Sequence, residues 1–307
     1  MSKLKYIFLL SAYVTLVFSS CEEGSFSQVV TIEIPEHDPL PVVLLQVDAG
    51  QERQLSALVS NSKSILDPES TYTVPADAEL MLYRDGALYA EFTLFTDVFR
   101  YEYFGNEPFP NVPGETWRLE ASIPSFNPVA IEQVMPPKPI IKDAAYEIEG
   151  TIDPGGFRVD ELIVDVEDAE PGVLNYYGLT LWQHFVVTDP TTGDTIQRSR
   201  NRVYLDSNDP LLSYSDRYGL VFNDEGFANN EYQLRSYTYY SLDGEGDTSL
   251  EVIVNQLTED AWLYARSLEQ YYNAIDNPFA EPVTVHSNVD GGFGVFTLVN
   301  RTSFFID

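Results

Sequence analysis

Hydrophobic and polar residues alternate along most of this chain with a period of two, which is typical of β-strands that bury one face. Val30, Ile32 and Ile34 alternate with polar residues, and residues 42–47 form a nearly continuous apolar strand. Residues 117–123 place Trp, Leu, Ala and Ile on one face and Arg, Glu and Ser on the other. Antiparallel sheets with one buried face give this pattern. The first half of the chain is therefore predicted to be a β-sandwich.

Two short segments predict turns between neighbouring strands. Asp85-Gly86 follows an apolar strand at 80–82 and precedes another at 91–95. Because both central residues of a type I′ turn need positive φ, this pair favours a tight hairpin. Residues 189–193, Asp-Pro-Thr-Thr-Gly, predict a second turn further along the chain.

A proline-rich segment divides the chain into two predicted domains. Residues 135–140 contain three prolines, which cannot donate to a β ladder and favour extended polyproline geometry. We predict an N-terminal β-sandwich over 29–134 and a second β-rich domain over 141–307, both sandwich-like in the immunoglobulin manner. The strands expected in the second domain lie at 162–166, 176–187, 196–205, 232–240, 250–254 and from 295 onward.

One segment in the second domain has helical spacing instead. Ala261, Tyr264, Leu268 and Ile275 recur every three or four residues. Thr258 suits the N-cap position, and the two acids that follow it suit the positive end of a helix dipole. The spacing predicts a helix over 258–275, which either covers an open end of a sheet or binds a partner.

The N-terminus has the pattern of a lipoprotein export signal. Lys3 and Lys5 precede an apolar run over 6–18, which is shorter than the roughly 20 residues of a membrane span. Two serines then precede Cys21, the only cysteine of the chain. We predict a signal peptide over 1–20, acylation of Cys21 and a polar tether over 21–28, with an ordinary signal peptide or an uncleaved anchor as the alternatives.

The charge balance excludes one class of partner. The chain has 48 acidic and 17 basic residues, a formal net charge of −31. Such a chain repels nucleic acid, which binds by releasing counterions to a basic surface. At 44% hydrophobic residues the chain can still bury a core, so the sequence predicts a folded protein with an acidic surface. That net field favours cationic or metal-bearing cargo.

Catalytic and metal-binding patterns are weak in this sequence. No Gly-x-Ser-x-Gly elbow occurs, and His37, His184 and His286 are far apart, so we assign no catalytic and no cofactor-binding residues. The most suggestive metal segment spaces Asp243, Glu245 and Asp247 like the start of a calcium loop, but the loop pattern is incomplete. A solvated hairpin tip is the alternative. We expect no cofactor, with calcium as a weak candidate, and a second acidic cluster lies at 165–170.

The glycines of residues 291–294 resemble a phosphate-binding loop only superficially. The residues after them have the pattern of a strand, whereas a phosphate cradle needs a helix N-terminus there. We therefore expect these glycines to serve a backbone turn or close packing.

Several C-terminal segments together resemble a family of uncharacterised Bacteroidetes outer-membrane lipoproteins, classified as a domain of unknown function. The segments are 257–262 (Leu-Thr-Glu-Asp-Ala-Trp), 271–272, 277–282 (Asn-Pro-Phe-Ala-Glu-Pro) and 287–296 (Ser-Asn-Val-Asp-Gly-Gly-Phe-Gly-Val-Phe). Such proteins are often encoded beside SusC-type TonB-dependent receptors. The resemblance implies a non-enzymatic accessory or binding subunit of a nutrient uptake system.

The resemblance also implies an outer-membrane location with a lipid anchor. Glu22 and Glu23, directly after Cys21, are similar to the signals that send such lipoproteins to the cell surface. The family carries no assigned catalytic residues. An exported hydrolase or glycan-processing enzyme, and a structural or adhesive envelope protein, stay open as alternatives.

Overall fold

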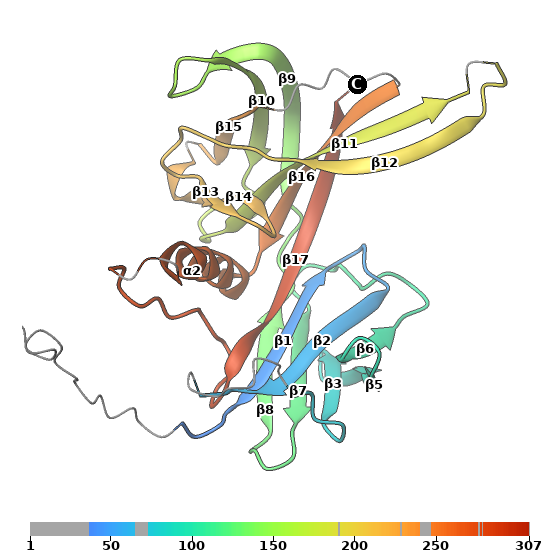
Figure 1. The fold of residues 1–307 in the computed structure, drawn as a ribbon, viewed down its shortest axis with the longest axis vertical. Coiled ribbons are helices and arrows are strands. Elements are labelled where there is room, and N and C mark those ends of the chain that lie inside the picture. The colour runs from blue at the N-terminus through green and yellow to red at the C-terminus, as the bar shows by residue number, and fades with distance from the viewer. Residues whose placement is uncertain are drawn as a thin grey trace, which may run out of the picture. The chain divides into compact units, whose positions relative to one another are not determined.

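The computed structural model describes residues 37–64, 73–189, 191–227, 229–239, 247–275, 277 and 279–306 (Figure 1). These residues form a mainly β structure with several sheets, which confirms the predicted fold class. The described part of the chain has one α-helix, α2 (Glu259–Ile275), where the helical spacing predicted it, and a single 3-10 turn, η1 (Asp224–Gly226). Residues 1–20, Cys21, the tether and the predicted strand at 30–34 lie outside the described residues.

The strands, in chain order, are β1 (Pro41–Asp48), β2 (Gln54–Asn61), β3 (Glu79–Arg84), β4 (Ala87–Glu91), β5 (Thr93–Phe95), β6 (Arg100–Phe104), β7 (Thr116–Ser122), β8 (Val129–Val134), β9 (Ile140–Ile152), β10 (Arg158–Glu167), β11 (Tyr176–Thr188), β12 (Thr195–Val203), β13 (Ser213–Ser215), β14 (Gly219–Asn223), β15 (Glu231–Thr238), β16 (Asp247–Leu257) and β17 (Phe293–Ile306). The largest sheet has the order β13-β14-β11-β16-β17-β1-β2-β6-β5, with β12 paired to β11. Two smaller sheets have the orders β4-β3-β7-β8 and β15-β10-β9.

Each small sheet packs on a different part of the large sheet and encloses its own core. The first core lies between β1, β2 and β6 and the four-stranded sheet, with Leu45, Trp117 and Leu119 at its centre. The second core lies between the β11, β14 and β16 part of the large sheet and the three-stranded sheet, around Leu162 and Val252. This sandwich-like arrangement follows from the alternation of apolar residues along the strands.

The last strand, β17, runs through both parts of the structure (Figure 1). Its first half pairs parallel with β1, from Val42 opposite Phe293 onward, and its second half pairs antiparallel with β16. Phe296 therefore packs in the first core, while Phe304 packs against the second. The division into domains at residues 135–140 stays a prediction, and β17 contributes side chains on both sides of it.

The helix α2 covers one part of the large sheet's other face. Ala261 and Ala265 are its buried residues, and they pack against Tyr176, Leu257 and Val299. Small alanine side chains let the helix lie close to the strands. Among the described residues, no helix has the length and apolar character that crossing a membrane requires.

Both predicted turns are present. Asp85 and Gly86 have φ of 46° and 81° and join β3 to β4, as the type I′ pattern requires. Asp189 and residues 191–193 lie between β11 and β12, and the Gly193 amide donates to the Asp189 carbonyl at 2.8 Å, while Pro190 lies outside the described residues.

The glycines at the start of β17 allow its backbone to approach β1. Gly294 lies opposite Val43 with φ of +108°, and a Cβ at this position would lie 1.9 Å from the Val43 carbonyl oxygen. A Cβ on Gly292 would lie 2.6 Å from the Pro41 carbonyl oxygen. The expectation of a strand, with glycines for close packing, is confirmed.

We expect Gly294→Ala to destabilise the protein by about 3 kcal/mol or more, because positive-φ strain and backbone overlap add together. The control is Gly291→Ala, which has φ of +71° but no atom within 4 Å of the new Cβ, so only about 1–2 kcal/mol is lost. Urea denaturation of both variants measures the difference. If both variants lose the same free energy of unfolding, the close contact with β1 is not the reason for a glycine at position 294.

Candidate functional site

Beyond the end of α2, the large sheet has a face formed by polar, charged and aromatic side chains. We call it the open face and define it by Trp182 and His184 on β11, Arg198, Arg200 and Arg202 on β12, Glu251 on β16, and Arg301, Ser303 and Phe305 on β17. The open face is accessible to solvent; Phe305, for example, is 55% exposed.

Strand register brings these residues together although they come from distant parts of the chain. Trp182 lies opposite both Arg202 and Glu251, and Glu251 lies opposite Phe305. Side chains directly opposite one another point to the same side of a sheet. The alternate residues of the same strands, such as Leu181 and Val252, are buried in the second core. One face of the sheet therefore supports the fold and leaves the other available.

Glu251 is the central side chain of the open face. Its Oε2 accepts a hydrogen bond from Arg200 Nη2 at 2.9 Å and lies 2.8 Å from His184 Nε2. Burial acts to raise the pKa of Glu251, but the His184 hydrogen bond and the Arg200 charge outweigh it, so the pKa lies below its ordinary value. Glu251 therefore carries its negative charge at neutral pH and fixes both partners.

Arg200 is held from two directions. Its guanidinium lies 4.2 Å from the centre of the Trp182 ring, a cation–π distance, while its Nη2 bonds Glu251. On the same strand, Arg202 donates to the carbonyls of Ser215 and Asp216. The arginines are thus ordered before any ligand arrives.

The open face has a histidine, a serine and a carboxylate but not the order of a hydrolase triad. Ser303 hydrogen-bonds Glu251, and so does His184. In a triad the serine donates to the imidazole and the imidazole to the carboxylate. Here Glu251 holds both groups, so this arrangement provides charge and hydrogen bonding instead of an activated serine.

Acidic residues from the β1–β2 turn lie beside Arg217 at the rim of the open face. Arg217 Nη2 lies 3.5 Å from Asp48 Oδ1, and Glu52 Oε2 accepts a bond from the Asp48 amide at 3.3 Å. Burial, with the nearby Asp48 charge, raises the pKa of Glu52 to about 7, although Arg217 and Arg301 oppose this. Glu52 can therefore change its charge near neutral pH.

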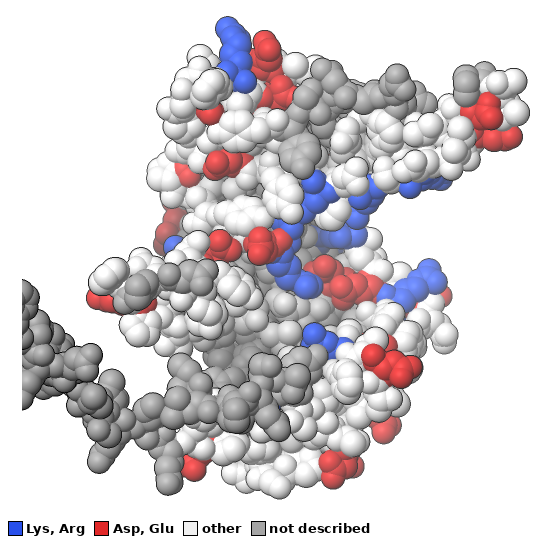
Figure 2. Space-filling view, viewed as in Figure 1, with Lys and Arg blue, Asp and Glu red and all other residues white. Residues whose placement is uncertain are grey.

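Figure 2 shows Lys and Arg side chains gathered along β12 and toward the centre of the viewed face, with Asp and Glu beside them. This concentration is unexpected on a chain with a net charge of −31. Sequence reasoning missed it. The spacing of Arg198, Arg200 and Arg202 at alternate positions of a strand was the one signal that could have indicated a basic face.

The sequence-predicted metal candidates cannot be placed in this structure. Asp243 and Glu245, and the side chain of Asp247, lie outside the described residues. In the described segments, no group of three or more His, Cys, Asp or Glu side chains could hold a metal ion. Within the second acidic cluster, the side-chain amide of Asn175 donates to Asp168 and to Asp224.

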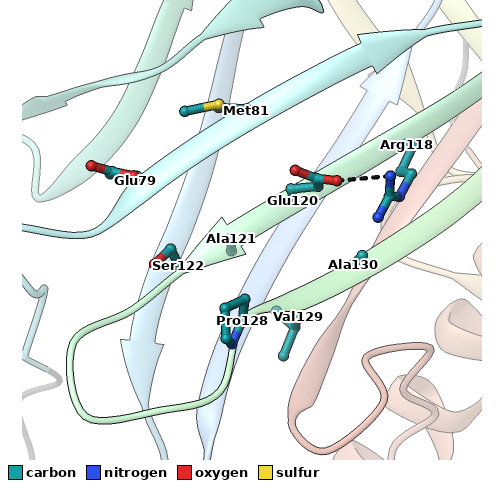
Figure 3. A pocket seen from close by; sticks show the side chains of 9 residues that line it. All are labelled: Glu79, Met81, Arg118, Glu120, Ala121, Ser122, Pro128, Val129 and Ala130. Carbon is teal, nitrogen blue, oxygen red and sulfur yellow. Dashed lines mark ion pairs between the residues drawn. The ribbon is translucent and has the colours of Figure 1, made fainter. Parts of the chain in front are cut away.

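A shallow hollow of about 360 Å³ lies on the outer side of the four-stranded sheet (Figure 3). Met81, Glu79 and Ser122 line it, and the Glu120 carboxylate points toward Arg118, 2.8 Å away. Arg118, Glu120 and Ser122 are the residues that the alternation along β7 predicts on the solvent side of the strand. Apart from this ion pair, few polar groups converge there, so it is a weaker candidate than the open face.

Two of the segments behind the family resemblance, 257–262 and 287–296, contribute to a structural clamp at the start of α2. Asp260 accepts hydrogen bonds from Gln133 on β8 at 2.6 Å and from Asn288 at 2.9 Å, and pairs with His286 at 2.6 Å. Asn288 also bonds both the amide and the carbonyl of Phe296, as a neighbouring strand would. These residues hold α2, β8 and β17 together.

We expect Asp260→Asn to lower the free energy of unfolding at pH 7 by about 1–3 kcal/mol, because the buried Gln133 and the half-buried His286 and Asn288 lose a charged partner. Burial favours a raised pKa for Asp260, but the bonds from Asn288, His286 and Gln133 lower it below its ordinary value. The contribution is thus present above the unfolded pKa and is lost as pH falls through the folded one. Urea denaturation from pH 7 to strong acid should show the gap closing.

The matched control is Glu259→Gln, which removes the same charge from the same helix turn but only one hydrogen bond, from Tyr176. Glu259→Gln should lower the free energy of unfolding clearly less than Asp260→Asn does. A larger loss in the control would mean that the helix-end charge, and not the clamp, explains the effect.

Comparison with known proteins identifies a family for this chain but no individual relative. No curated protein matches the chain. One family model, described as a domain of unknown function (DUF4249), matches residues 28–304 and so includes both cores, α2, the clamp and all of the open face except Phe305. The chain therefore belongs to the DUF4249 family.

Proposed function

We propose that this protein is a lipid-anchored lipoprotein of a Bacteroidetes outer membrane, exposed at the cell surface, that assists a SusC-type TonB-dependent receptor in nutrient uptake. Its role is to bind, not to catalyse. The anchor is Cys21, acylated after removal of residues 1–20, and residues 21–28 tether the folded part to the membrane.

The open face is the observation that best supports a binding role. It presents ordered arginines, a central carboxylate and an exposed phenylalanine on a continuous strand scaffold. Rigid strands hold such side chains with little conformational freedom to lose on binding. His184 and Ser303 both hydrogen-bond Glu251 and not each other, so this arrangement favours ligand binding over hydrolysis.

The test is to isolate the lipidated full chain from native outer membranes in mild detergent and to identify co-purifying proteins by mass spectrometry. We expect a TonB-dependent receptor in a fixed ratio to the lipoprotein. Cys21→Ser should release the protein from the membrane fraction. A protein that purifies alone would contradict the accessory role and favour an adhesive or enzymatic one.

A matched pair of surface variants tests whether the receptor contacts the open face. Phe305→Ser changes an apolar residue there that is 55% exposed, and Leu88→Ser changes one on β4 that is 56% exposed. We expect at least about tenfold less receptor with Phe305→Ser, the loss of one well-packed interface aromatic. Leu88→Ser should retain it. Equal recovery with both variants would place the contact elsewhere.

A further inference from the structure

Arg301 is a partly buried arginine whose Nε has no hydrogen-bond partner among the described residues. This Nε is buried, and Arg301 forms no ion pair in the described part of the chain. Burial lowers the pKa of its guanidinium, and the neighbouring Arg200 charge adds to this against the opposing carboxylates. Taking a cation out of water without pairing it is costly. The free energy lost by burying this guanidinium is recovered only if another group, such as a bound anion, interacts with it.

The surroundings of Arg301 contain two further arginines, beside the carboxylates of Asp48, Glu52 and Glu251. Arg200 lies on the open face with its orientation fixed by Trp182 and Glu251, and Arg217 lies at the rim. Guanidinium groups carry several donors in a planar fork that matches carboxylate, phosphate and sulfate oxygens. Since these side chains are already ordered, an anion would lose little binding energy to rearrangement.

Protection of a sheet edge does not explain Arg301. Charges on an edge strand prevent pairing with another chain, and this can account for Arg198, Arg200 and Arg202 on β12. Among the described strands, Arg301 pairs only with Asn255 of β16, because the pairing of β17 with β1 ends at Val299. A charge that protects an edge acts from solvent, however, and this role leaves the buried Nε of Arg301 unexplained. A structural ion pair does not explain it either, since Asp48 pairs with Arg217 and Glu251 pairs with Arg200.

The net charge of the chain limits the size of the ligand. At physiological salt, charges farther apart than about 8 Å are largely screened, so a local cluster can bind a compact anion. A long polyanion would extend over the acidic remainder of the surface and be repelled. The compatible ligand is thus a small molecule or group with one or a few oxyanions.

We propose that the open face holds a binding site for a compact oxyanion, in which Arg301 takes the carboxylate, phosphate or sulfate group and Arg200 and Arg217 flank it. The site does not rest on the transport role. Anion binding can be measured on the purified protein whether or not a receptor co-purifies, and failure of one proposal leaves the other standing.

The proposed site should also bind more tightly as pH falls from 8 to 6. Glu52 faces Asp48, Arg217 and Arg301, and its pKa of about 7 means that it becomes neutral over this range. Losing this negative charge beside the arginines favours an anion. Glu52→Gln should remove most of the pH dependence, which separates Glu52 from His184 and other titratable groups on the face.

The experiment titrates the purified full chain with phosphate, sulfate and citrate at constant ionic strength, by calorimetry and by melting temperature. We expect saturable binding of at least one anion and a rise in melting temperature with its concentration. Arg301→Gln should weaken binding at least about tenfold, as expected for loss of a charge-assisted hydrogen bond. The control is Arg118→Gln, which removes one positive charge from another sheet and should bind like the wild type.

The melting temperature of the Arg301→Gln variant without anion distinguishes a ligand-binding role of Arg301 from a structural one. If Arg301 is kept for a ligand, Arg301→Gln should melt at the wild-type temperature or above it when no anion is present. A clear fall would mean that Arg301 supports the fold and would overturn the proposal. If that variant does not fold, Arg217→Gln should still weaken binding by about threefold to tenfold. No saturable binding of any of the three anions to the wild type would also overturn it.

Discussion

The pairing of β17 with β1 on one side and β16 on the other is the interaction on which the rest of this structure depends. It joins two segments from opposite ends of the described chain and makes one continuous sheet from strands that would otherwise form separate ones. The close approach has a strict steric condition, since Gly294 admits no side chain against Val43. Asn288 then continues the hydrogen bonding beside Phe296. Residues that carry the family resemblance thus serve this junction.

The open face is a consequence of the same sheet. A strand shows its two faces alternately, so each buried residue of β11, β16 and β17 is followed by one that points the other way. Around α2 those residues are apolar and covered, as Val299 is. Farther along, the same side of β17 holds Arg301 and Phe305. Each of these strands is covered by α2 along one part and exposed along the next. The exposed charged side chains are therefore held by strands that are fixed in the core.

Much of the fold could be predicted from local pattern, whereas the candidate site could not. Alternation indicated most strands, Asp85-Gly86 indicated a hairpin, and helical spacing indicated α2. The pattern detected only the beginning of β17, because polar residues such as Asn300 and Arg301 interrupt its apolar run. Glu251 and Arg200 are brought together by pairing across distant segments, and their charges act on Arg301. A net charge of −31 hides this local group of arginines. Apart from the alternate arginines of β12, no pattern in the single sequence indicates it.

The place of β17 in the chain determines the order in which the protein can form. The first core is incomplete until Phe296 and Leu298 are in position, and these residues are synthesised long after the β1 strand with which they pair. Pairings between residues so far apart in sequence close slowly, because a long loop must be ordered first. The first core therefore cannot finish folding before β17 has been made. For the exported lipoprotein that we propose, such a delay would keep the chain unfolded until translocation is complete.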